Sequence, residues 1–275
     1  MEKFTAILGA KLMGFDEQMR LTESDWKTLL KYDTWEYLNL LRKLLSTNRN
    51  CILPLLNKIL YNFAFEDFSQ WYSQSCLEPN FYKLYRARIY TKPIVKELEN
   101  NPFQGYDEKN SFVPPANSIK FEGRVNKRHQ VVLYAASSPQ GAIAEINPNV
   151  GNVVSVATIE ITRNLHLFNM AHTNMGIEAG TPQKTNWIQK FILDLAECFY
   201  SVHINKEDYY LSQYVGSYIK TLGFDGIRYF SSKNESNISE TANFNYAILN
   251  YDKCKAVSSK KYYVAKVAIN YFEFN

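Results

Sequence analysis

The chain has 275 residues, enough for one large domain or two smaller ones, and 46% of them are hydrophobic. That apolar share, with 20 Tyr and 17 Phe, excludes a disordered chain. The formal net charge of +4 is smaller than is typical of nucleic-acid-binding domains, so we expect no direct nucleic-acid binding.

Metal, membrane and secretory classes are not indicated. The four cysteines form no CxxC pair and the four histidines form no HExxH motif, so we expect no metal site. No run approaches the ~20 apolar residues of a membrane span, and the N-terminus lacks a clean cleavage site. We expect a cytoplasmic protein with reduced thiols and no membrane contact.

The first 78 residues predict an all-helical bundle of about four helices. Two N-cap signals, Thr22 with Asp25 and Asp33 with Glu36, each precede an apolar run of helical period. Residues 48–76 predict two further helices, with Pro54 near the start of the first. We therefore treat residues 1–78 as a separate domain.

From residue 79 the pattern changes to strands with interspersed helices, which predicts an α+β domain over 79–275. A proline-containing loop is expected over 97–121. The expected helices are 139–146, 186–202 and 208–223, the last ending at Gly223. Alternating or β-branched segments predict strands at 81–91, 131–137, 153–162, 165–168, 224–232, 244–250 and 262–274.

One stretch, Gly123–Glu145, places three chemically distinct side chains on three local structures. Arg124 lies in a turn, Tyr134 in the apolar strand VVLYAA, and Glu145 on a short Ala-rich helix after Pro139. A cation, an aromatic ring and a carboxylate could together hold an anionic, ring-bearing ligand and act on it. Each residue alone is more often structural, since most arginines and glutamates are simply exposed.

Further polar candidates lie on either side of this stretch. Arg86 and Arg88 are two apart and so face the same side of a strand, where arginine suits phosphate contacts. Gln213 lies within a helix, and Ser231 follows the strand GIRYF. The sequence has no GxSxG and no phosphate-binding GxxxxGK[ST] motif.

Taken in order, several blocks resemble the RES domain family, known mainly as the toxin half of RES–Xre toxin–antitoxin modules. The resemblance covers about 79–275 and rests on YRAR, GRVN, LYAAS, AIAE, YYLSQYVGSYIKTLGFDGIRYFSS and NYAIL. It implies an ADP-ribosyltransferase-like fold with a mixed sheet. It also implies that NAD is a substrate, not a cofactor, cleaved at the nicotinamide–ribose bond by hydrolysis or phosphorolysis.

The resemblance also assigns roles to residues. Glu145, Arg124 and Tyr134 would be catalytic, and Arg86, Arg124, Tyr134 and Ser231 would bind NAD. From its place within the helix, Gln213 is a further candidate for NAD binding. An Xre-like antitoxin is the implied partner, and a homo-oligomer is left open. The N-terminal bundle is similar to HEPN domains, but no histidine precedes His129, so we expect an interaction, dimerisation or self-restraint module without nuclease activity.

Two other functions stay open on sequence grounds. An ADP-ribosyltransferase acting on a macromolecule would share the NAD site and differ in its acceptor. A non-catalytic nucleotide- or RNA-binding module could use the abundant aromatic residues for stacking on bases.

Overall fold

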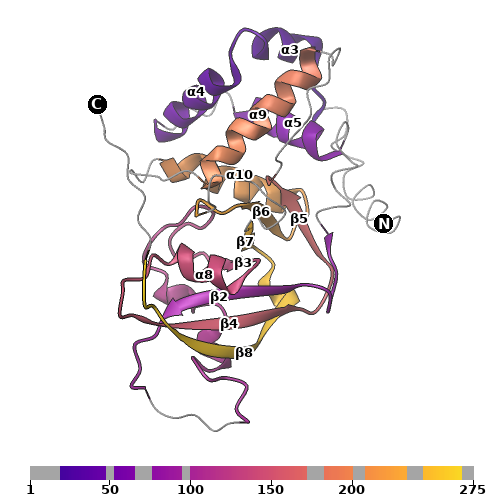
Figure 1. Ribbon diagram of the computed structural model, residues 1–275. Helices are drawn as coiled ribbons and strands as arrows, with labels where there is room; N and C mark the ends of the chain where they lie inside the picture. The colour runs from indigo at the N-terminus through magenta and orange to yellow at the C-terminus, as the bar shows by residue number, and fades with distance from the viewer. Residues whose placement is uncertain are drawn as a thin grey trace, which may run out of the picture.

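A computed structural model describes residues 19–47, 53–65, 76–94, 100–171, 183–200, 208–233 and 244–267, and structural statements below concern these residues. Figure 1 shows most of the helices at one end of the molecule and the strands β2 (Lys83–Ile89), β4 (Val153–Ile161) and β8 (Cys254–Tyr263) at the other.

The N-terminal region is helical, as predicted, with α3 (Glu23–Leu29), α4 (Thr34–Ser46) and α5 (Leu53–Phe65). Both predicted capping boxes are present. The Thr22 hydroxyl accepts from the backbone N–H of Asp25, and the Asp33 carboxylate caps α4, with side chains at the third helical position returning a bond in each case. These bonds satisfy N–H groups that a helix start otherwise leaves unpaired. The second helix predicted within 48–76 lies largely outside the described residues.

An eight-stranded mixed sheet forms the other part of the fold, in the order β1-β5-β6-β7-β3-β2-β4-β8. Every neighbouring pair is antiparallel except β5 and β6. With the helices this confirms the α+β class. The strands are β1 (Cys76–Leu77), β2 (Lys83–Ile89), β3 (Leu133–Ala136), β4 (Val153–Ile161), β5 (Leu165–Asn169), β6 (Gly226–Phe230), β7 (Phe244–Ile248) and β8 (Cys254–Tyr263).

The helices predicted between the strands are also present: α8 (Pro139–Glu145), α9 (Gln183–Tyr200) and α10 (Asp208–Thr221). Ser138 caps α8 through the N–H of Gly141, with Pro139 at the first position, where its missing N–H costs nothing. Gly223 takes a φ of 91° just after α10, the left-handed conformation that ends many helices. The predicted loop contains the short helices α7 (Glu108–Ser111) and η2 (Ala116–Ser118), and η3 (Tyr251–Lys253) precedes β8.

The last strand was predicted over 262–274, but β8 is Cys254–Tyr263. The prediction missed 254–261 and was wrong over 264–267, which have no strand structure, and residues 268–274 lie outside the described residues. The Lys- and Ser-rich segment CKAVSSKKYY lacks a strong apolar alternation. It forms a strand because it pairs with β4 along its length at the edge of the sheet, and an edge strand tolerates exposed lysines.

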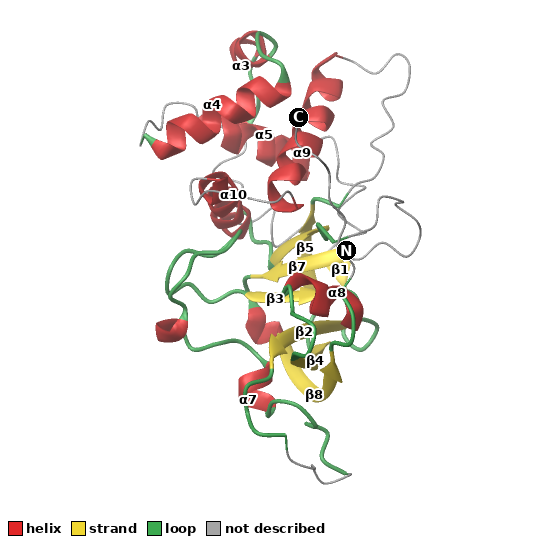
Figure 2. Ribbon diagram, turned by 60° about the vertical axis from the view of Figure 1, so that its left-hand side comes forward, coloured by secondary structure: helices red, strands yellow, loops and turns green. Residues whose placement is uncertain are grey.

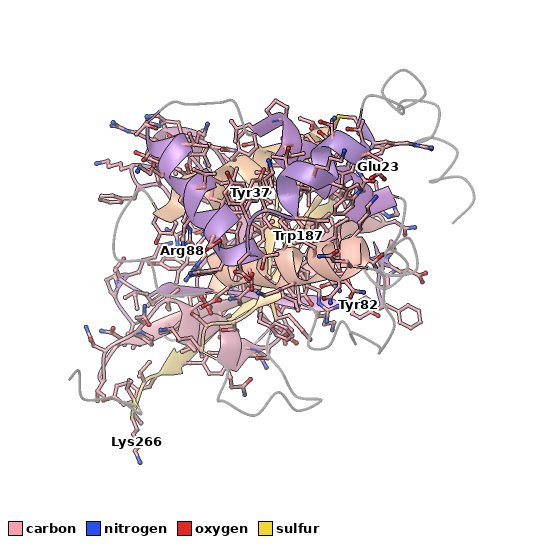
Figure 3. All side chains as sticks on the ribbon, turned by 90° about the horizontal axis from the view of Figure 1, so that it is seen from above. Glu23, Tyr37, Tyr82, Arg88, Trp187 and Lys266 are labelled. Atoms are coloured by element: carbon pink, nitrogen blue, oxygen red, sulfur yellow. The ribbon has the colours of Figure 1, made fainter. Side chains whose placement is uncertain are left out.

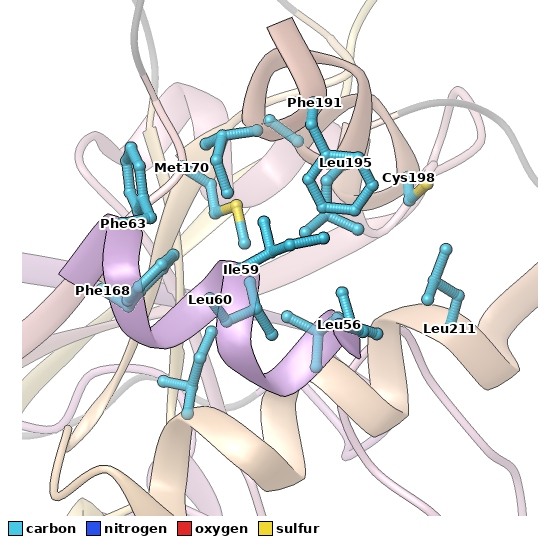
Figure 4. Close-up of a cluster of buried hydrophobic side chains, with 14 of the residues drawn as sticks. Leu56, Ile59, Leu60, Phe63, Phe168, Met170, Phe191, Leu195, Cys198 and Leu211 are labelled. Carbon is cyan, nitrogen blue, oxygen red and sulfur yellow. The ribbon is translucent and has the colours of Figure 1, made fainter. Parts of the chain in front are cut away.

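The largest hydrophobic core joins the N-terminal helices to α9, α10 and the sheet. Tyr37 of α4 packs against Trp187 and Phe191 of α9, with ring centroids 5.8 Å apart in both cases. Figure 3 labels Tyr37 and Trp187 near each other in the view from above. Figure 4 shows side chains of α5, such as Leu56 and Ile59, in the same cluster as residues of the sheet and of α9. The core is therefore continuous across residue 78, and the division into 1–78 and 79–275 stays a prediction.

Polar contacts follow the same interface between the N-terminal helices and α9. Lys190 of α9 pairs with Asp33 at 2.5 Å, and Lys184 pairs with Glu23. The indole N–H of Trp187 donates to the carbonyl of Tyr32 at 3.0 Å.

The strands divide their side chains between two faces of the sheet. Tyr134, Tyr229 and Ala247 belong to the face that carries α9 and α10, where they join the large core. On that same face, Ala87 and Ala136 pack beneath α8 with Ile143, and Figure 2 shows α8 against this part of the sheet. The opposite face carries a separate cluster that includes Leu84, Leu133, Ala135, Tyr246 and Ile248.

Within the described residues, every helix is too short or too polar to cross a membrane.

Candidate functional site

The turn that carries Arg124 is bound to the strand that carries Tyr134. The Tyr134 hydroxyl donates to Oδ1 of Asn126 at 2.9 Å and accepts from the backbone N–H of Val125 at 3.0 Å. Gly123 closes the turn by donating its N–H to the carbonyl of Asn126 at 3.0 Å. The phenol hydroxyl thus positions the Arg124 turn, a role the sequence did not reveal.

Gly123 is required by this geometry. A Cβ at that position would lie 2.5 Å from Oδ1 of Asn126 and 3.0 Å from the hydroxyl of Tyr134, closer than van der Waals contact allows. The absent side chain of Gly123 therefore lets the Asn126 amide and the Tyr134 hydroxyl lie close to the turn.

Helix α10 holds the turn from its other side. The side-chain amide of Gln213 donates to the carbonyls of Gly123 at 3.0 Å and Asn126 at 3.2 Å, and the Ser212 hydroxyl bonds to the carbonyl of Arg124 at 2.6 Å. Both polar side chains are at most 2% exposed, and a buried amide needs such partners. Gln213, predicted to bind NAD, here uses its amide N–H groups on the protein backbone, and its contact with a ligand stays a prediction.

Glu145 and Ser231 meet from distant parts of the chain. Glu145 is the last residue of α8 and Ser231 follows β6 directly. The Ser231 hydroxyl donates to Oε1 of Glu145 at 2.6 Å and also accepts from the backbone N–H of Lys233 at 3.1 Å. Within the described residues no hydrogen bond is found to Oε2 of Glu145, so one carboxylate oxygen is fixed and the other is available.

The two halves of the site are electrostatically coupled through buried tyrosines. Burial raises the pKa of Tyr134 to about 12, although the N–H bond from Val125 and the nearby Arg124 charge lower it. Burial also raises the pKa of Tyr229, and the neighbouring Tyr134 and Glu145 raise it further. Both phenols are therefore neutral near pH 7, which makes them hydrogen-bonding groups and not bases.

Arg86 lies on the opposite face of the sheet from Tyr134 and Tyr229. Tyr85 pairs with Ala136, and alternation along β2 then places Arg86 with Leu84 on the opposite face. There its guanidinium donates to the carbonyl of Ser111 at 3.3 Å. Burial and the nearby Arg88 charge lower its pKa to about 10, so it stays a cation at neutral pH. Its binding of NAD remains a prediction.

The family of this chain follows from a comparison with protein-family models. The model of the RES domain matches residues 83–270, about two thirds of the chain and all the predicted site residues. The chain belongs to the RES domain family.

No curated protein matches the chain. Among solved structures, it is similar to a chain of the M. tuberculosis MbcT–MbcA toxin–antitoxin complex, at 11% identity and a TM-score of 0.40. The match covers 73% of this chain and 94% of the other.

In this RES domain the predicted residues form two hydrogen-bonded sets. Tyr134, Ser212 and Gln213 hold the Arg124 turn, and Ser231 holds Glu145. Tyr229 feels the electrostatic influence of both sets. Together these residues offer a cation for phosphate, an aromatic ring, and a carboxylate with one oxygen held by Ser231. The sequence did not single out Asn126, Ser212 and Tyr229. Asn126 stands in the GRVN block and Ser212 in YYLSQ, but only the fold shows their partners.

No group of three or more His, Cys, Asp or Glu able to hold a metal occurs in the described ranges.

Proposed function

We propose that this RES domain degrades NAD by cleaving its nicotinamide–ribose bond, with water or phosphate as the acceptor. One observation supports the proposal most: the 2.6 Å hydrogen bond from Ser231 to Glu145, which holds one oxygen of a carboxylate in place. Family membership and the order of these residues along the chain support it as well.

The roles follow from the chemistry of the substrate. In NAD the nicotinamide nitrogen is part of a cationic pyridinium, so it leaves with the electrons of the C–N bond and becomes neutral without receiving a proton. The ribose then develops oxocarbenium character, which a nearby carboxylate stabilises. Glu145 would supply that charge through Oε2 or orient the nucleophile, while Ser231 holds Oε1.

The remaining residues would bind the substrate. Arg124 would contact the pyrophosphate, since its guanidinium matches phosphate oxygens. Tyr134 would present its ring to the substrate, with its hydroxyl occupied by Asn126 and Val125. This use of the hydroxyl assigns Tyr134 to binding and positioning, because a phenol with a pKa of about 12 is a poor base at neutral pH.

At the cellular level we propose a toxin or defence effector that depletes NAD in the cytoplasm, paired with an Xre-like antitoxin. The toxin role is what the RES resemblance implies.

Product analysis tests the proposal. Purified protein is incubated with NAD, with and without phosphate, and the products are identified by mass spectrometry. We expect free nicotinamide, with ADP-ribose or its 1″-phosphate as the second product. Label from NAD on a macromolecule would instead show ADP-ribose transfer, and tight NAD binding without nicotinamide release would show a binding module.

A further inference from the structure

Asn245 of β7 carries a buried polar atom that the described protein leaves unsatisfied. The residue is 4% exposed, and its Oδ1 has no hydrogen-bond partner among the described residues. Burying an acceptor without a donor is unfavourable, and native structures contain few such groups. An orphan acceptor of this kind indicates a group that binds there.

The sheet places this atom at the candidate site. Asn245 pairs with Ala136 of β3 on one side and with Tyr229 of β6 on the other. Alternation puts it on the face that carries Tyr134 and Tyr229, beneath α8 and the large core. Tyr229, the strand partner of Asn245, has its pKa raised by both Tyr134 and Glu145. Asn245 is therefore next to a residue that both parts of the site influence.

The chemistry of the orphan atom limits its ligand. An amide oxygen is neutral and only accepts hydrogen bonds, so it suits an O–H or amide N–H and not a phosphate oxygen. NAD carries both kinds of donor beside the scissile bond, in the ribose hydroxyls and in the nicotinamide carboxamide. We propose that Asn245 is a substrate-binding residue that accepts a hydrogen bond from one of these neutral donors. This inference rests on the proposed NAD-cleaving function.

A removal experiment tests it, with a matched control. Asn245→Ala removes the amide, and Asn245→Val removes it while keeping a similar side-chain volume in a residue type that strands favour. Asn62→Ala is the control, because Asn62 is equally buried, at 5% exposure, but its amide donates to the carbonyls of Lys58 and Met19. Thermal stability without ligand and kcat/KM for nicotinamide release from NAD are measured for each protein.

We expect the Asn245 variants to keep the thermal midpoint of the wild type, since the unliganded protein loses no bond to Oδ1. Their kcat/KM falls about 5- to 30-fold, as for loss of one hydrogen bond in a binding site. Asn62→Ala lowers the midpoint and keeps kcat/KM. Calorimetric titration then identifies the donor. Weaker binding of ADP-ribose indicates a ribose hydroxyl, and weaker binding of nicotinamide indicates the carboxamide.

Two results would overturn the inference in distinguishable ways. A wild type that releases nicotinamide, with both Asn245 variants equally active and equally able to bind both products, would show that Asn245 is structural. A wild type that releases no nicotinamide would overturn the proposed function and this inference together.

Discussion

Replacing Tyr134 by Phe removes one hydroxyl and keeps the ring, which separates the two uses of this side chain. The hydroxyl donates to Asn126 at 2.9 Å and accepts from Val125 at 3.0 Å. Asn126 is 6% exposed and Val125 is 1% exposed, so water cannot readily replace the lost partner. Leaving a buried polar group unpaired costs about 1–3 kcal/mol.

With two groups affected, we expect Tyr134→Phe to lower the free energy of unfolding by about 2–6 kcal/mol. For a chain of this size that is a fall of roughly 4–24 °C in the thermal midpoint. Differential scanning calorimetry measures it, and Tyr263→Phe, at an exposed tyrosine (68%), is the control that should leave the midpoint unchanged. An unchanged midpoint in Tyr134→Phe, with nicotinamide release abolished, would refute the positioning role and assign the hydroxyl to the chemistry.

Three further predictions concern Gln213, the core residue Tyr37 and the pH dependence of Tyr134. Gln213→Leu leaves the carbonyls of Gly123 and Asn126 without their amide donor. We therefore expect a loss of about 1–3 kcal/mol in the free energy of unfolding and slower nicotinamide release. Unchanged values for both would contradict the role of α10 in holding the Arg124 turn. Tyr37→Ala empties a fully buried site against α9 and should cost about 3–5 kcal/mol within a single calorimetric transition, whereas two separate transitions would contradict the shared core. The pKa of Tyr134 is raised from 10 to about 12 in the folded state, so its contribution of about 3 kcal/mol is present below pH 10 and is lost as pH rises through 12. Denaturant midpoints measured from pH 8 to 12 should decrease between pH 10 and 12 for the wild type and decrease less for Tyr134→Phe.

Local features of the fold were predictable because their signals lie within a few residues. The capping boxes of α3 and α4, the Ser138 cap of α8 and the left-handed Gly223 all depend on side chains next to the backbone they serve. β8 was misplaced because its strand structure comes from pairing with β4 and not from its own alternation.

The sequence could predict which residues belong to the candidate site, but not which of them contact one another. Ser231 and Glu145 are 86 positions apart, and no local pattern shows that they bond. The side of β2 on which Arg86 lies depends on the register of Tyr85 with Ala136. The orphan oxygen of Asn245 is likewise visible only once three strands are assembled.

The most direct test of the proposed function compares nicotinamide release from NAD by the wild type and by Glu145→Gln. Gln is isosteric and can keep the contact with Ser231, so we expect the variant to fold with a thermal midpoint near that of the wild type. We expect nicotinamide release by the wild type and a loss of about 100-fold or more in the variant, since the charge that stabilises the oxocarbenium is gone. Equal rates for both folded proteins would contradict the assignment of Glu145 as the catalytic carboxylate.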